Sequence, residues 1–291
     1  MQQPIKPRRS VLYLPGSNAR ALEKARTLPA DVLILDLEDA VASDAKEKAR
    51  QQIVEAVQAG GYGHREVVIR VNALDSQWGQ MDVQAVATCG ADAIAFPKVE
   101  SAMQVRQAVA ALDKAGAPGT LPVWIMAETP RGILDIDAIA ASHSRLKAIV
   151  IGTSDLAKAL RVPHTPERLG LLTSLGMCVL AARVHGLDIL DGVYLDLEDE
   201  VGLRAACCQG RELGFDGKTL IHPKQIAIAN EIFAPSQEEV ERAERMIEAW
   251  EQARARGEGV IVCDGKLVES LHVEEAYRVL ALARIVKKKG N

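Results

Sequence analysis

The sequence predicts an α/β fold, a (β/α)8 TIM barrel with a C-terminal helix-hairpin-helix extension. Eight short apolar runs recur along the 291-residue chain, and turn residues bound each of them. Runs that are apolar on both faces are typical of parallel strands covered by helices, and amphipathic stretches separate these runs. A barrel of this kind takes roughly 250 residues, so some residues remain for an extension. We therefore expect the barrel over residues 1–234 and the extension over residues 235–291.

The eight apolar runs have the length and composition of strands. In chain order they span residues 10–16, 31–39, 66–72, 93–99, 122–129, 148–154, 189–195 and 217–223. Helical patterns lie between them. Ser101 has the position of an N-cap before an apolar stripe that runs from Val105 to Leu112. Further helices are expected over residues 44–59 and from residue 165 or 166 to residue 185.

The extension carries three local signals. Ser236 and Glu239 have the spacing of a capping box, and an apolar stripe at helical spacing follows them. Asp264 and Gly265 form a favoured two-residue turn, which predicts a β-hairpin. A last helix over residues 272–286 ends in lysines that complement the helix dipole. We expect the extension to pack on the barrel or on a neighbouring subunit.

The composition argues against several classes of function. Lys and Arg number 35 against 39 Asp and Glu, so no positive charge excess attracts nucleic acid or anionic membranes. No apolar run approaches the roughly 20 residues of a membrane span, and no apolar segment of a secretory signal follows the N-terminal basic residues. The five cysteines lack C-x-x-C spacing, which argues against disulfides or zinc. We expect a cytoplasmic protein that binds neither nucleic acid nor membranes.

Charged residues end the second strand and lie within the third. Catalytic groups of such barrels lie at the C-terminal ends of strands, so polar residues there are the candidates. The segment VLILDLED places Asp36 and Glu38 on one face, and Asp39 follows at the rim. Arg70 lies in an apolar strand, where a guanidinium needs carboxylates or a bound anion to offset its desolvation. Asp36 and Glu38 are its expected partners. Arg70 then serves either a structural ion pair or a substrate oxygen.

Two further acids end neighbouring strands at the same rim. Glu128 closes the fifth strand and Asp155 the sixth, which supplies two oxygen ligands of the kind that Mg²⁺ takes. No His or Cys lies nearby, so a zinc site is not expected. Lys98 closes the fourth strand. His222 follows the eighth strand and is either a base or a residue that fixes its loop.

The chain contains, in this order, the motifs RRSVLYLPGSN, DLEDAV, VIRVN, FPKVES, AETPRG, GTSDLA, GFDGKTLIHPKQ and DGKLVE. Together they resemble the citrate lyase β-subunit-like family. That family includes malyl-CoA and citramalyl-CoA lyases and belongs to the phosphoenolpyruvate/pyruvate aldolase superfamily. The resemblance extends from about Arg8 to Ala283.

The resemblance implies that Glu128 and Asp155 hold Mg²⁺ and that Arg70 binds substrate oxygens. The candidate substrate-binding residues are Arg70, Glu128, Gly152, Asp36 and Lys98, and the candidate catalytic residues are Arg70, Glu38, Asp39 and Glu269. Asp39 stands where related free-aldol aldolases carry a histidine, which points toward the CoA-thioester branch. The family's C-terminal hairpin usually presents an aspartate to an adjacent subunit, and Glu269 stands in its place here. Ser154 stands where family members often have an acid.

These observations predict a Mg²⁺-dependent carbon-carbon lyase. It would cleave a β-hydroxyacyl-CoA such as citramalyl-CoA, malyl-CoA or citryl-CoA into acetyl-CoA, or another acyl-CoA, and a small 2-oxo acid. Family resemblance implies a homotrimer or hexamer. The alternatives are a malyl-CoA-type thioesterase, a citrate lyase β subunit that acts on an acyl-carrier-bound thioester, and a purely structural barrel.

Overall fold

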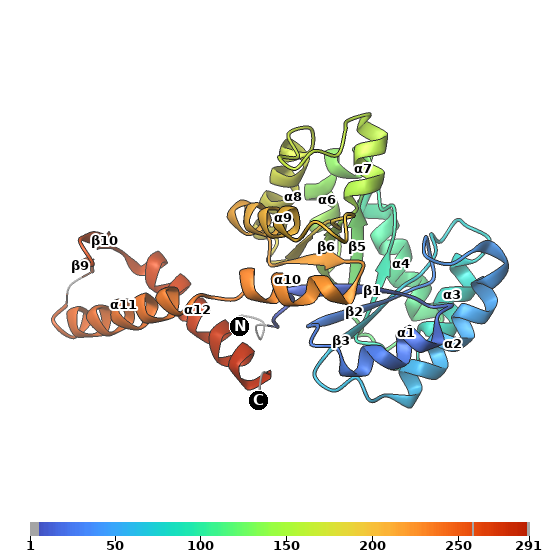
Figure 1. Ribbon diagram of the computed structural model, residues 1–291, viewed down its shortest axis with the longest axis horizontal. Coiled ribbons are helices and arrows are strands. Elements are labelled where there is room, and N and C mark those ends of the chain that lie inside the picture. The colour runs from blue at the N-terminus through green and yellow to red at the C-terminus, as the bar shows by residue number, and fades with distance from the viewer. Residues whose placement is uncertain (1–5, 258, 290–291) are drawn as a thin grey trace. The chain divides into compact units, whose positions relative to one another are not determined.

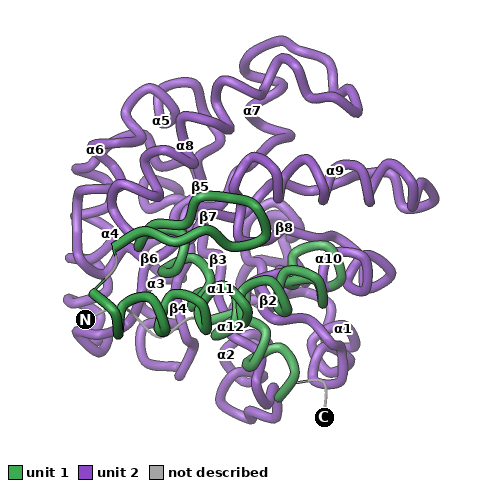
Figure 2. Tube along the Cα trace, turned by 90° about the vertical axis from the view of Figure 1, so that its left-hand side faces the viewer, with its two compact units in different colours: residues 1–7, 231–291 green, residues 8–230 purple. Residues whose placement is uncertain are grey.

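The computed structural model describes residues 6–257 and 259–289. The chain divides into two compact units, which Figure 2 shows in different colours. One unit is Arg8–Asn230, and the other combines residues 1–7 with residues 231–291. Among the described residues, no helix has both the length and the apolar character that crossing a membrane requires.

The larger unit is a closed barrel of eight parallel strands in sequence order, in which β8 pairs with β1 (Figure 1). The strands are β1 (Ser10–Pro15), β2 (Val32–Asp36), β3 (Glu66–Arg70), β4 (Ala93–Phe96), β5 (Val123–Ala127), β6 (Leu146–Ile151), β7 (Asp188–Asp191) and β8 (Gly217–Leu220). All eight expected strands are present, and the predicted TIM barrel is confirmed.

Apolar side chains from one face of β1 to β7 form a cluster in the barrel interior. The interior cluster consists of Val11, Val32, Ile34, Val68, Ala93, Ala95, Trp124, Met126, Ala148, Val150 and Leu190, with Tyr13 packed against it. The alternate residues of the same strands, among them Leu33 and Leu35, are also fully buried. Because both faces are buried, the strands read as continuous apolar runs in the sequence.

Helices surround the strands of this unit (Figure 1). They are α1 (Ala19–Lys24), α2 (Lys46–Ala59), α3 (Gly79–Val86), α4 (Ala102–Lys114), α5 (Pro130–Leu134), α6 (Ile136–Ala140), α7 (Thr153–Leu160), α8 (Leu172–Val184), α9 (Glu200–Leu213) and α10 (Ile226–Ile232). Short 3₁₀ turns occupy Ala25–Thr27, Ser43–Ala45 and Pro223–Gln225. Ser101 caps α4 as expected, since its side chain accepts a hydrogen bond from the Gln104 backbone.

Several expected boundaries are wrong, since each of the eight strands ends one to four residues earlier than expected. The helix expected from residue 165 or 166 begins only at Leu172, after Arg168 adopts a left-handed backbone with φ of 53°. Strand β2 ends at Asp36 rather than at residue 39. The Asp36 carboxylate accepts hydrogen bonds from the Glu38 and Ala40 backbones, and these bonds turn the chain away from the strand ladder.

The smaller unit contains α11 (Gln237–Ala255), the strands β9 (Ile261–Cys263) and β10 (Lys266–Val268), and α12 (Ser270–Lys289). The predicted capping box of Ser236 and Glu239 is present. The hairpin turns at Asp264 and Gly265, whose φ values of 49° and 73° are those of a type I′ turn. The last helix begins at Ser270, two residues before the expected start.

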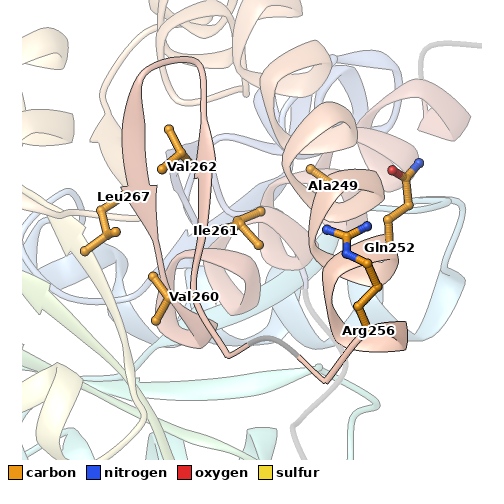
Figure 3. Close-up of a pocket in the computed structure, with 7 residues that line it drawn as sticks. All are labelled: Ala249, Gln252, Arg256, Val260, Ile261, Val262 and Leu267. Carbon is orange, nitrogen blue, oxygen red and sulfur yellow. The ribbon is translucent and has the colours of Figure 1, made fainter.

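A hollow of about 450 Å³ lies between α11 and the hairpin (Figure 3). Its lining consists of Ala249, Gln252, Arg256, Val260, Ile261, Val262 and Leu267. Among the described residues, the lining includes no carboxylate, the group that a divalent cation takes as a ligand.

Candidate active site

The ends of β2 and β3 bring a carboxylate and a guanidinium face to face. Asp36 and Arg70 are register partners in these two neighbouring strands. Arg70 donates from Nε to Asp36 Oδ1 and from Nη2 to Asp36 Oδ2, both at 2.6 Å. Both side chains are buried. A planar guanidinium that binds a carboxylate in this bidentate way has a fixed orientation.

The remaining nitrogen of Arg70 reaches the two acids that follow β2. Arg70 Nη1 lies 3.0 Å from Glu38 Oε2 and 3.5 Å from Asp39 Oδ2. Lys98 contacts the same acids, with its Nζ 2.8 Å from Glu38 Oε1 and 3.9 Å from Asp39 Oδ1. Glu38 is buried between the two cations, whereas the Asp39 side chain is 59% exposed. Of the two acids, Asp39 is therefore the one that water reaches readily.

Arg70 rests on two interior side chains. Its guanidinium lies over the Tyr13 ring, 4.9 Å from the ring centre, and its Nη1 is 3.5 Å from Met126 Sδ. Burial alone would lower the pKa of Arg70, but Asp36, with smaller contributions from Tyr13 and Glu38, more than offsets burial, so the pKa lies above its ordinary value. Arg70 is therefore a permanent, rigidly held positive charge.

The side chains of Lys46 and Asn72 hold the backbone of the DLED segment in place. Lys46 Nζ donates to the carbonyls of Leu37 and Glu38 and to Asn72 Oδ1, at 2.7 to 2.8 Å. Asn72 Nδ2 also donates to the Leu37 carbonyl. Lys46 is not among the residues that the sequence motifs single out. A signal was available, because Lys46 lies on the stripe of α2 that contains the buried residues Ala49 and Ile53.

Glu128 follows β5 and is held by two neighbouring loops. Its Oε1 accepts a 2.7 Å hydrogen bond from the Lys98 backbone, which has a left-handed φ of 52°. A Cβ atom on Gly152 would lie 2.3 Å from Glu128 Oε2, so only glycine leaves room for this carboxylate. Burial raises the pKa of Glu128 to about 7; the Lys98 N–H and Arg70 oppose this rise.

Asp155 lies in the first turn of α7, directly after β6. Its Oδ2 is 4.0 Å from Lys98 Nζ, and its side chain is 41% exposed. The charges of Asp155 and Glu38 add to the rise in the Glu128 pKa, so negative charge accumulates around Glu128. Such an excess suits a divalent cation with oxygen ligands, and Mg²⁺ takes only one or two carboxylates together with water and substrate oxygens.

Within residues 6–257 and 259–289, no group of three or more His, Cys, Asp or Glu side chains is arranged to hold a metal. Glu128 and Asp155 therefore offer a metal ion two carboxylates and no third ligand of these types among the described residues. Such a pair matches the open coordination of Mg²⁺ and lacks the nitrogen and sulfur ligands of zinc sites.

The polar residues near β8 have separate roles. Lys218 is buried and donates to Asp191 Oδ2 and to the Gly192 carbonyl. Burial opposes ionisation of Asp191, but Lys218 and Arg168 hold its pKa below its usual range. His222 caps the following 3₁₀ turn, with its Nδ1 accepting from the Lys224 backbone, so it fixes the loop.

The structure therefore brings Asp36, Glu38, Asp39, Arg70, Lys98, Glu128, Gly152 and Asp155 into one cluster at the C-terminal ends of β2 to β6. Glu269 belongs to the C-terminal unit, where its backbone N–H donates to His272 Nδ1.

The sequence matches known families and proteins over most of its length. Residues 9–223 match the family model HpcH/HpaI aldolase/citrate lyase. The chain is 53% identical over 280 residues to a (3S)-malyl-CoA thioesterase of Cereibacter sphaeroides strain KD131, covering 96% of both chains. It is 37% identical over 289 residues to the citrate lyase subunit beta of Escherichia coli K12, covering 98% of this chain and 96% of the relative.

Solved structures give a consistent result. The protein CitE of Mycobacterium tuberculosis, in complex with magnesium, acetoacetate and coenzyme A, superimposes with a TM-score of 0.75 at 29% sequence identity. The match covers 94% of this chain and 97% of that one. A citrate lyase beta subunit from the same organism, complexed with oxaloacetate and magnesium, gives a TM-score of 0.65 at 30% identity and covers 78% of this chain and 96% of that one.

Proposed function

The chain belongs to the HpcH/HpaI aldolase/citrate lyase family, and we propose that it is a Mg²⁺-dependent enzyme that hydrolyses the thioester of a CoA ester of the malyl-CoA type. The observation that carries this proposal is the 53% identity to malyl-CoA thioesterases over 96% of the chain. The cluster around Arg70 and Glu128 supports it, because it joins a carboxylate pair with a fixed cation. The CoA ester and its small hydroxy-acid part are the substrate portions that the site has to recognise.

Glu128 and Asp155 are the proposed ligands of Mg²⁺. When bound, the ion would supply a Lewis acid that orients the hydroxyl and carboxylate of the substrate. Arg70 is the proposed donor to oxygen that gains negative charge, since its orientation is fixed by Asp36 before the substrate arrives. One such preorganised donor is commonly worth roughly 3 kcal/mol in the transition state.

Asp39 is the proposed base for the attacking water, because its side chain is 59% exposed while Glu38 is buried between two cations. Water transfers a proton to the Asp39 carboxylate and adds to the thioester carbonyl. The carbon–sulfur bond then breaks, and the proton on Asp39 passes to the departing thiolate. The products are free CoA and the hydroxy-dicarboxylic acid.

Carbon-carbon cleavage is the second candidate, and the identity to citrate lyase subunit beta favours it. In that reaction Arg70 would stabilise the thioester enolate rather than a tetrahedral oxyanion. Malyl-CoA would then give acetyl-CoA and glyoxylate. Glu269 is relevant to the choice between hydrolysis and carbon-carbon cleavage. The resemblance implies an aspartate at this position, whereas this chain has a glutamate, whose side chain is longer by one methylene.

Product analysis separates the two reactions. The purified chain is incubated with Mg²⁺ and a panel of malyl-, citramalyl- and citryl-CoA, and free thiol, acetyl-CoA and 2-oxo acid are measured in parallel. We expect free CoA and malate from malyl-CoA. Release of acetyl-CoA and glyoxylate without free CoA would refute hydrolysis, and inactivity on every CoA ester would favour a carrier-bound substrate. Asp155→Ala is the matched variant and should lose turnover and metal binding while it stays folded.

We further propose that Glu269 acts at the active site of a neighbouring subunit in a homotrimer or hexamer. A mixing experiment tests this role. Glu269→Ala and Glu128→Gln are each expected to be inactive alone. Mixed oligomers formed by unfolding and refolding the two variants together should regain part of the activity, because some sites then combine an intact Glu128 with an intact Glu269. No recovery in oligomers shown to be mixed would contradict action between subunits.

A further inference from the structure

Lys98 lies at the centre of the acidic cluster, and the proposed mechanism gives it no step. We propose that Lys98 is an internal competitor of the metal ion: its ammonium group offsets part of the negative charge of the cluster when Mg²⁺ is absent and must be displaced when Mg²⁺ binds. The inference rests on the proposed function, since it takes Glu128 and Asp155 as the metal ligands.

The ammonium group of Lys98 reaches three acids from two different segments. Its Nζ lies 2.8 Å from Glu38 Oε1, 3.9 Å from Asp39 Oδ1 and 4.0 Å from Asp155 Oδ2. One of these acids, Asp155, is a proposed metal ligand. A cation that bridges several carboxylates in this way satisfies the same charges that a divalent ion would satisfy.

The backbone of Lys98 is tied to the other proposed ligand. Its N–H donates to Glu128 Oε1 at 2.7 Å, and the residue holds a left-handed φ of 52°. Non-glycine residues adopt this conformation at some cost, so the surrounding structure has to maintain it. One residue therefore orients a metal ligand through its main chain and opposes metal binding through its side chain.

The Lys98 side chain is free to move when the metal arrives. It is 44% exposed, whereas its partner Glu38 is 9% exposed. A lysine ammonium is a hydrated point charge on a flexible stem, so it can move into water, and Arg70 Nη1 still lies 3.0 Å from Glu38 Oε2 when it does. Displacement frees Asp155 and leaves the Lys98 N–H on Glu128 unchanged. The cluster then binds metal more weakly than its carboxylates alone would.

Neutral substitutions of Lys98 should tighten metal binding without substrate. Lys98→Met keeps the length of the side chain, and Lys98→Asn suits a left-handed backbone in case the first variant does not fold. At a separation of about 6 Å, a singly and a doubly charged cation repel enough, even in water, to change an affinity about tenfold. We expect both variants to bind Mn²⁺, used as the probe for Mg²⁺, about tenfold more tightly than the wild-type protein.

Free Mn²⁺ is measured by electron paramagnetic resonance in titrations at fixed pH. Lys224→Met is the matched control, because Lys224 forms an exposed ion pair with Glu198 and makes no contact with the cluster among the interactions described; its affinity should equal that of the wild type. Equal or weaker Mn²⁺ binding by folded Lys98 variants would overturn the inference about Lys98 and leave the proposed function unaffected. Failure of both the wild-type protein and the Lys98 variants to bind Mn²⁺ overturns the metal site of the proposed function as well.

Discussion

Replacing the buried acid Glu128 by glutamine should stabilise the metal-free protein while it abolishes metal binding. Glu128 is 3% exposed, and burial raises its pKa from the ordinary 4.5 to about 7. Between these two values the unfolded chain releases the proton and the folded chain keeps it. The free energy of unfolding of the metal-free protein therefore falls as the pH rises from 4.5 to 7.

The size of this effect follows from the two pKa values. Each pKa unit between folded and unfolded states corresponds to about 1.4 kcal/mol. A folded pKa near 7 against 4.5 therefore costs the metal-free protein about 3 kcal/mol of unfolding free energy above pH 7. Glutamine has the same shape, accepts the same hydrogen bond from Lys98 and does not titrate. It should remove this cost entirely.

Urea unfolding in the presence of EDTA measures the difference. Near pH 4 the wild-type protein and Glu128→Gln should have similar stability, and near pH 8 the variant should be more stable by about 3 kcal/mol. Added Mg²⁺ should raise the unfolding midpoint of the wild type and leave that of the variant unchanged. A stability difference that does not depend on pH would show that burial of the Glu128 charge is not what costs stability.

Substitutions at three further positions test other parts of the proposed site. Gly152→Ala should lower Mn²⁺ affinity at least tenfold and stability by about 1–3 kcal/mol, because the added Cβ would overlap Glu128. Gly176→Ala is the control. Its Cβ meets open space in α8, so this variant should be mildly more stable in thermal unfolding. Arg70→Lys should lose about 100-fold or more in kcat despite the conserved charge, since lysine cannot bind in a bidentate way; steady-state kinetics with less than tenfold loss would contradict this. Glu269→Asp should keep turnover and Glu269→Ala should lose it while Mn²⁺ binding stays unchanged, and an active Ala variant would make the hairpin purely structural.

The strands and the pairing of Arg70 with Asp36 could be predicted because both depend on patterns within or between neighbouring strands. A strand buried on both faces needs a continuous apolar run, and charged residues at the ends of adjacent parallel strands meet at one rim. The strand end at Asp36 could not be predicted in this way. It depends on the Asp36 side chain, which accepts two hydrogen bonds from the following backbone and competes with the sheet.

The contacts of Lys98 and Gly152 were also beyond prediction, although both residues were recognised as candidates. They depend on the distances in space between the loops that follow β4, β5 and β6. The spacing of residues along the sequence does not determine these distances. The contact between Gly152 and Glu128 is an example. Its φ of −89° is open to any residue, so the requirement for glycine comes only from the carboxylate beside it.

The charges of the cluster indicate the order in which ligands bind. Five carboxylates, those of Asp36, Glu38, Asp39, Glu128 and Asp155, share the cluster with two cations, those of Arg70 and Lys98. At full ionisation three negative charges remain in excess, and one divalent ion would cancel two of them. Without the ion, an anionic substrate carboxylate would enter a negative field. The charges of Glu38 and Asp155 already add to the rise that burial causes in the Glu128 pKa. The metal and the anionic substrate therefore assist each other, and the metal-free protein should bind the CoA ester more weakly than the loaded protein does.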